Sequence, residues 1–80
     1  METIVHVTHY TVDGEPQETT QHQLTPRQIV VNAGLNPDER YLVEIKQRGE
    51  ISYQDKMDVP INMHEHQKFV TFPVGSTPVS

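Results

Sequence analysis

Cysteine and tryptophan are absent from this 80-residue sequence, and large apolar side chains are scarce. Without cysteine, neither a disulfide framework nor a thiolate metal site is available, and a chain that folds without such staples is typical of the cytoplasm. Hydrophobic residues make up 34% of the chain, and the mean hydropathy is −0.61. Because this composition supports one small core, we expect a single domain that buries nearly every large apolar residue.

Long apolar runs and clusters of basic residues are also missing. No stretch approaches the length of about 20 residues that a membrane-spanning helix needs. The first seven residues, METIVHV, lack the basic segment of a signal peptide. The net charge is −5, and the six Lys and Arg residues are scattered singly, which argues against nucleic acid as a partner. We therefore expect a cytoplasmic protein that binds neither membranes nor nucleic acids.

Motifs of enzymatic chemistry are missing as well. Ser52, Ser76 and Ser80 lie outside any Gly-x-Ser-x-Gly context. The four glycines, at positions 14, 34, 49 and 75, form no phosphate-binding loop. We expect no catalytic residue, no cofactor and no enzymatic activity of the chain by itself.

Histidine, by contrast, is frequent, with five residues. His64 and His66 are two residues apart, but zinc needs three or four protein ligands and the spacing supplies no others. A solvated turn before the last strand is therefore the favoured interpretation, and a small metal-binding protein is the alternative. His6, His9 and His22 are expected on the surface of an N-terminal hairpin.

The first third of the chain predicts that hairpin. Residues Thr3–Val12 are rich in β-branched side chains and Tyr, as strands are. Asp13-Gly14 tolerates the positive φ angles of a tight turn, and Gln17–Leu24 is readable as the returning strand.

The segment Thr25-Pro26-Arg27-Gln28 predicts the start of a helix. Thr25 is a good N-cap, Pro26 suits the first helical position, and Gln28 completes a capping box. The predicted helix ends near Gly34, which suits a left-handed C-terminal residue.

The remaining elements are shorter. Tyr41–Gln47 alternates, with Tyr41, Val43 and Ile45 on one face and Leu42, Glu44 and Lys46 on the other. Further strands are predicted at Ile51–Tyr53 and Lys68–Phe72, and Met57–Met63 is predicted as a turn-rich crossing with Val59 and Ile61 facing inward. One helix covers one face of a sheet, so we expect an α+β fold of the β-grasp type: a mixed sheet of four to five strands with one main helix.

The uncovered face of that sheet is a candidate partner site. If Phe69 enters the core, alternation places Val70 and Phe72 on the opposite face, where we expect them to form an exposed apolar patch with Leu42. A register slip of one residue would exchange the two faces.

The order of these elements resembles the prokaryotic multiubiquitin domain, a ubiquitin-like β-grasp family. The resemblance covers about Leu24 to Phe72. It rests on a capped helix, an Ala-Gly-apolar step, a strand, an Asp-Val-apolar step and a Phe-containing last strand, at Thr25–Gln28, Ala33–Leu35, Tyr41–Ile45, Asp58–Ile61 and Phe69–Phe72.

The resemblance implies a bacterial protein modifier that is activated at its C-terminus by an ATP-dependent enzyme and conjugated to target proteins. Its partners would be an activating enzyme, a conjugating enzyme and a processing or deconjugating peptidase. The alternative is a β-grasp module for protein-protein interaction that is not conjugated.

Residues 1–72 would then form the globular domain and residues 73–80 a flexible tail with the sequence PVGSTPVS. The conjugation and processing residues would be Pro73, Val74, Gly75, Ser76 and Ser80. Ubiquitin relatives usually end in Gly-Gly, whereas this tail has the single Gly75. Two routes follow: a peptidase cuts after Gly75, which we favour, or the Ser80 carboxylate is activated directly.

Overall fold

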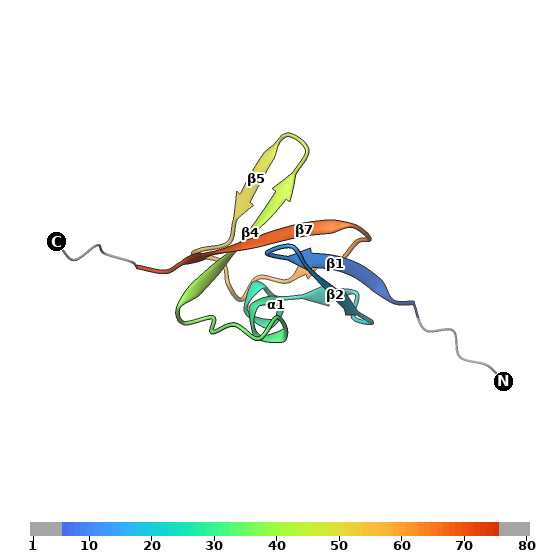
Figure 1. Cartoon of the computed structure of the whole chain (residues 1–80), viewed down its shortest axis with the longest axis horizontal. Coiled ribbons are helices and arrows are strands. Elements are labelled where there is room, and N and C mark those ends of the chain that lie inside the picture. The colour runs from blue at the N-terminus through green and yellow to red at the C-terminus, as the bar shows by residue number, and fades with distance from the viewer. Residues whose placement is uncertain (1–5, 76–80) are drawn as a thin grey trace.

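The computed structural model describes residues 6–75 and shows one helix beside seven strands (Figure 1). The elements in chain order are β1 (Thr8–Val12), β2 (Glu15–Thr19), β3 (Gln23–Leu24), α1 (Pro26–Asn32), β4 (Arg40–Lys46), β5 (Gly49–Ser52), β6 (Ile61–Asn62) and β7 (Gln67–Pro73). No helix within the described range is long and apolar enough to span a membrane.

The predicted hairpin turn is confirmed. Asp13 and Gly14 have φ angles of 53° and 82°, which a two-residue turn between twisted strands requires. The returning strand, however, is divided into β2 and β3. Thr19 Oγ1 accepts a hydrogen bond of 3.0 Å from the Gln21 amide, which bends the chain where a single strand was predicted.

The start of the helix is also as predicted. The Gln28 amide donates to Thr25 Oγ1 and the Thr25 amide donates to Gln28 Oε1, which completes the capping box. The helix ends at Asn32, two residues before the predicted end. Gly34, with φ of 82°, then reverses the chain, and the Leu35 amide donates to the Val30 carbonyl at 3.0 Å.

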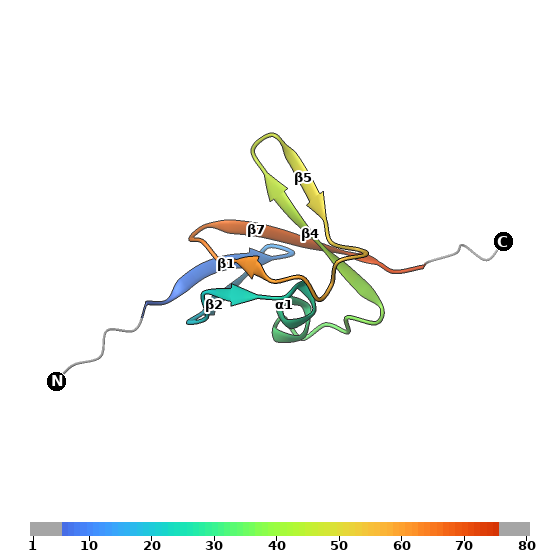
Figure 2. The same ribbon diagram turned by 180° about the vertical axis from the view of Figure 1, so that it is seen from behind.

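Five strands form a mixed sheet in the order β2-β1-β7-β4-β5, in which β1 and β7 are parallel and all other neighbours antiparallel. The short strands β3 and β6 form a separate antiparallel pair. The helix packs on one face of the larger sheet, which Figure 2 shows from behind. This arrangement is a β-grasp α+β fold, and the predicted fold class is confirmed.

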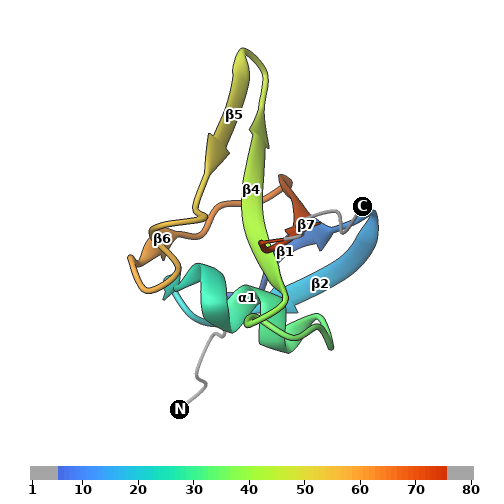
Figure 3. The same ribbon diagram turned by 90° about the vertical axis from the view of Figure 1, so that its left-hand side faces the viewer.

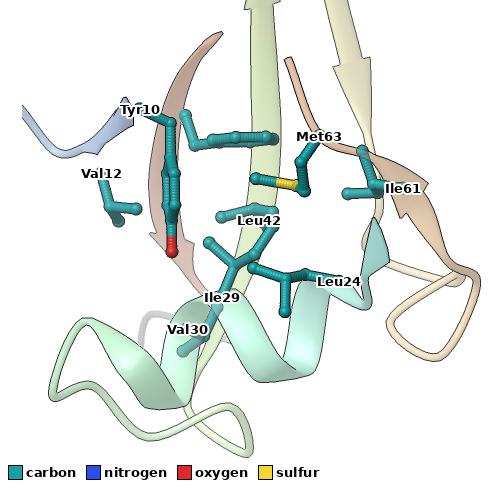
Figure 4. Packing of buried hydrophobic residues seen from close by; sticks show 9 residues of the cluster. Tyr10, Val12, Leu24, Ile29, Val30, Leu42, Ile61 and Met63 are labelled. Atoms are coloured by element: carbon teal, nitrogen blue, oxygen red, sulfur yellow. The ribbon is translucent and has the colours of Figure 1, made fainter. Parts of the chain in front are cut away.

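The core lies between the sheet and α1 (Figure 4). Its buried members are Tyr10, Val12, Leu24, Ile29, Val30, Leu42, Ile61, Met63 and Phe69. Of the two residues predicted to face inward within Met57–Met63, Ile61 is buried but Val59 is 48% exposed. The Val59 amide donates to the Lys56 carbonyl, so this residue closes a surface turn instead of entering the core.

The β4–β5 hairpin projects away from the helix and the rest of the sheet (Figure 3). All four residues of β5 are exposed, whereas the middle of β4, residues 42–44, is buried. The opposite edge of the sheet is the exposed strand β2.

Candidate functional site

The pairing of β4 with β7 determines which residues share a face of the sheet. Leu42 faces Thr71 and Glu44 faces Phe69 across the antiparallel ladder. Residues directly opposite each other lie on the same face, so these two pairs belong to the face that α1 covers, where Phe69 and Leu42 join the core.

The other face carries the apolar surface that we call the sheet patch: Tyr41, Val43, Ile45, Val70 and Phe72. The rings of Tyr41 and Phe72 lie 5.8 Å apart between centroids and are inclined by 35°. Phe72 is 41% exposed, whereas Val43 is buried although it lies outside the core cluster. The sheet patch is therefore apolar, and its rim is open at Phe72.

Leu42 does not belong to this patch, and its predicted position is wrong. Its side chain is 0% exposed and lies in the core, whereas Val70 and Phe72 lie on the uncovered face as predicted. The error came from placing Leu42 and Phe69 on opposite faces, when the observed register puts both on the covered face. Sequence reasoning consequently missed Tyr41, the direct neighbour of Phe72, although the alternation of β4 grouped it with Val43.

Glu44 explains why the covered face of β4 resembled a solvent face in the sequence. Its carboxylate is nearly buried at the edge of the core, where it accepts hydrogen bonds from the Tyr53 hydroxyl at 3.3 Å and from Gln67 Nε2 at 3.2 Å. Burial, and then the charge and hydrogen bond of Glu44, raise the pKa of Tyr53 above its usual value. Lys46 Nζ also lies 3.6 Å from Glu44 Oε2, so this buried acid is held by three partners and is structural here.

The predicted tail begins inside β7. Pro73 is the last residue of the strand, and the Val74 amide donates a 2.7 Å hydrogen bond to the Glu39 carbonyl. Pro73, Val74 and Gly75 are exposed, and Gly75 has a φ of 56°. Ser76 and Ser80, the remaining predicted tail residues, lie outside the described residues.

A network of hydrogen bonds around Thr71 precedes this tail, and we call it the Thr71 anchor: Asp13, Arg40 and Thr71. Asp13 accepts from the Thr71 amide at 2.8 Å and from its hydroxyl at 2.6 Å. Arg40 Nε donates to Thr71 Oγ1 at 2.7 Å, and Arg40 Nη2 donates to the Thr71 carbonyl at 2.9 Å. No sequence pattern indicated this network, because Asp13 and Thr71 are 58 residues apart.

The histidines are distributed over the surface. His64 and His66 are exposed, and His66 lies in the turn that leads into β7, which confirms the predicted turn. His9 lies between two carboxylates, with Nδ1 at 3.2 Å from Glu65 Oε1 and Nε2 at 3.7 Å from Glu18 Oε2. The hydrogen bond from the His9 amide is the main cause that lowers the pKa of Glu65. Among residues 6–75, no group of three or more potential ligands is placed to hold a metal ion.

Comparisons of the chain with family models, with curated proteins and with solved structures find no match. The fold and the geometry around β7 therefore carry the functional argument. Together they define a β-grasp domain with an apolar sheet face next to the end of β7.

Proposed function

We propose that this protein is a ubiquitin-like modifier that acts in the cytoplasm through a carboxylate at the end of its tail. The observation that carries the proposal is the position of β7. This strand lies between β1 and β4 in the sheet and runs straight into the tail at the rim of the sheet patch. An enzyme that binds the patch would therefore hold the start of the tail beside its active site.

The chemistry belongs to the partner enzymes. In the activation step, the tail carboxylate attacks the α-phosphate of ATP, which releases pyrophosphate and leaves an acyl adenylate. A thiol of the activating or conjugating enzyme then displaces AMP, and an amino group of the target protein displaces the thiol to form an amide. The modifier contributes a recognisable surface and an accessible chain end, and a peptidase supplies trimming or removal.

Two carboxylates remain candidates for activation. Cleavage after Gly75 would expose a Pro-Val-Gly end, because residues 76–80 would be removed. Alternatively, the Ser80 carboxylate is activated without trimming. Glycine suits the last position of a threaded tail because it carries no side chain that obstructs a narrow channel.

A non-conjugated interaction module is the second candidate, and a specific observation favours it. The hydrogen bond from the Val74 amide to the Glu39 carbonyl keeps the chain on the sheet at least as far as Val74. A carboxylate at Gly75 would thus lie only one residue, about 3.5 Å of chain, beyond Val74, which is a short reach into an ATP site. A module that only binds partners through the sheet patch has no such requirement.

Adenylation separates these candidates. The full chain and a chain that ends at Gly75 are each incubated with ATP and a candidate activating enzyme from the same organism, and pyrophosphate release and intact mass are measured. Activation of the shorter chain alone supports trimming, and activation of the full chain at its intact mass supports the Ser80 route. Absence of any adenylate or thioester with both chains contradicts the modifier proposal and leaves the interaction module.

A matched pair of substitutions tests the sheet patch. Phe72→Asp places a charge at the open rim of the patch, whereas Val31→Asp places one at an exposed valine of α1. We expect Phe72→Asp to weaken binding of the activating enzyme by about tenfold or more, the loss typical of an interface residue with a large contribution. Val31→Asp should leave binding unchanged, and equal losses in both variants would exclude the patch as the binding site.

A further inference from the structure

The pairing of β7 with its neighbouring strands changes at Thr71. Before this residue, the strand is held on both sides: β1 pairs with residues 67–69, the Asp13 amide donates to the Phe69 carbonyl, and β4 pairs along the other side. After Thr71, Phe72 and Pro73 pair with β4, and no other described strand lies on their second side. Strand ends that are held on one side open more readily than those held on two.

The Thr71 anchor stands at this boundary and uses every polar group of the residue. The amide and the hydroxyl of Thr71 donate to the two carboxylate oxygens of Asp13. The hydroxyl and the carbonyl accept from the Arg40 guanidinium. Thr71 is 5% exposed and thus lies between a carboxylate and a guanidinium with little access for water, where hydrogen bonds to charged groups are strongest.

Phe72–Val74, which we call the terminal strand segment, is held differently. Its contacts with β4 include the hydrogen bond from the Val74 amide to the Glu39 carbonyl and the ring contact of Phe72 with Tyr41. Between them, Pro73 lies opposite Arg40 at a position of the ladder that makes no hydrogen bond to β4. All three residues are exposed. The terminal strand segment is therefore attached at the surface, directly after the buried residue Thr71.

We propose that the Thr71 anchor fixes the root of a releasable chain end: the terminal strand segment detaches from β4, and the detachment stops at Thr71. Release adds about 10 Å of reach to the chain beyond Val74, at 3.3–3.6 Å per residue. An enzyme that acts at Gly75 would gain this reach when it binds the chain in an extended form. The role of the released segment rests on the proposed function, whereas the release itself is a property of the fold.

Amide hydrogen exchange of the full chain tests the boundary. We expect the amides of Phe72 and Val74 to exchange at least about tenfold faster than those of Phe69 and Thr71, as an opening limited to the strand end requires. Equal protection from Phe69 to Val74 would overturn the proposal, because the strand would then open as one unit.

Substitutions at Thr71 test the anchor itself. Thr71→Val keeps the side-chain shape but removes the hydroxyl, and we expect the amide at position 71 to exchange about tenfold faster, the change expected for the loss of hydrogen bonds to charged groups. Thr71→Ser should stay close to the parent protein. The matched control is Thr11→Val, the same change on the uncovered face of β1. The inference is wrong if the amide at position 71 exchanges at the same rate in Thr71→Val and in Thr11→Val.

Asp13→Asn provides a second variant in case Thr71→Val does not fold. Asn tolerates the positive φ at this turn position, so the hairpin is preserved while the charge is lost. We expect faster exchange at Thr71 with unchanged exchange in β2. An unchanged rate at Thr71 would contradict the role assigned to the Asp13 carboxylate.

A reversible staple tests whether release is needed for access to Gly75. Facing residues of an antiparallel pair lie within disulfide range, so the double variant Glu39→Cys/Val74→Cys can join the segment to the residue before β4. The native chain has no cysteine that would compete. With oxidised glutathione as the oxidant, two thiols form one disulfide and glutathione is reduced.

Subtilisin at low concentration then serves as the probe. We expect the reduced variant to be cut between Phe72 and Gly75 as the parent chain is, and the oxidised variant to be cut there at least about tenfold more slowly, since proteolysis follows the open population. Equal cleavage of both forms would overturn the proposal. Neither result depends on adenylation, so the modifier function can fail while the release stands, and the reverse also holds.

Discussion

The two faces of β4 and β7 differ in composition, and the face that packs on the helix carries more polar residues than the uncovered face. The covered face carries Leu42 and Phe69 together with the buried polar residues Glu44 and Thr71, whereas the uncovered face carries the apolar sheet patch. Each polar residue on the covered face has hydrogen-bond partners, which removes most of the cost of its burial. The comparison teaches that the more apolar face of a strand is not necessarily the one that packs on the helix.

The largest expected effect is the loss of a core side chain from the covered face. Leu42→Ala should lower the free energy of unfolding by about 2–5 kcal/mol, because it removes a fully buried side chain and leaves a cavity. Urea denaturation measures this. The control on the uncovered face is Ile45→Ala, where the side chain is half-buried, and we expect a clearly smaller loss. Similar losses for both variants would show that the two faces contribute equally to stability, which contradicts the comparison.

The second prediction concerns the helix that covers one face. Thr25→Ala removes the N-cap hydroxyl that accepts from the Gln28 amide, and we expect a loss of about 1 kcal/mol in the free energy of unfolding. Thr25→Ser should restore most of this loss, because Ser is an equally good cap. Thermal denaturation compares the three proteins, and equal melting temperatures for Ala and Ser would show that the hydroxyl does not contribute.

These two variants also mark how far sequence reasoning extends. The helix start and the hairpin turn are encoded in neighbouring residues, such as Thr25 with Gln28 and Asp13 with Gly14, so their patterns could be interpreted directly. The face of Leu42 depends on the register between β4 and β7, which no local pattern contains.

The candidate site divides in the same way. Val70 and Phe72 were placed on the uncovered face because alternation from Phe69 is a local rule. The Thr71 anchor was not predictable, because it joins Thr71 to Arg40 and Asp13, which lie 31 and 58 residues away in the chain. The sequence analysis assigned Asp13 only to the turn that it forms with Gly14.

A smaller effect is expected on the uncovered face. Phe72→Ala removes a ring that is 41% exposed and touches Tyr41, so the free energy of unfolding should fall by at most about 1 kcal/mol. If the sheet patch is a binding surface, the same variant should reduce partner binding more than it reduces stability. A stability loss as large as that of Leu42→Ala would show that Phe72 belongs to the core.

The smallest expected effect is a change in the pKa of Tyr53, which directly follows the β4–β5 hairpin. Burial and Glu44 raise the pKa of Tyr53, so the stability linked to this hydroxyl is present below the ordinary tyrosine range and is lost as the pH rises through the higher pKa of the folded state. Glu44→Gln removes the neighbouring charge and should lower the pKa of Tyr53 toward its usual value.

Ultraviolet titration of tyrosinate measures this change against Glu50→Gln, which removes an exposed charge from the same hairpin. A Tyr53 pKa that does not move in Glu44→Gln would mean that burial alone causes the shift. An equal change in Glu50→Gln would mean that Tyr53 responds to the net charge of the protein instead of to its partner.

The parallel pairing of β1 with β7 has a consequence for folding during synthesis. The first and the last strand of the described domain lie side by side in the middle of the sheet, about 57 residues apart in the chain at the pair Tyr10 and Gln67. On a ribosome, the hairpin and the helix can form as they emerge, but the sheet cannot close until β7 has left the exit tunnel. The sheet can therefore be completed only after β7 has been synthesised. Until then, the terminal strand segment stays unpaired.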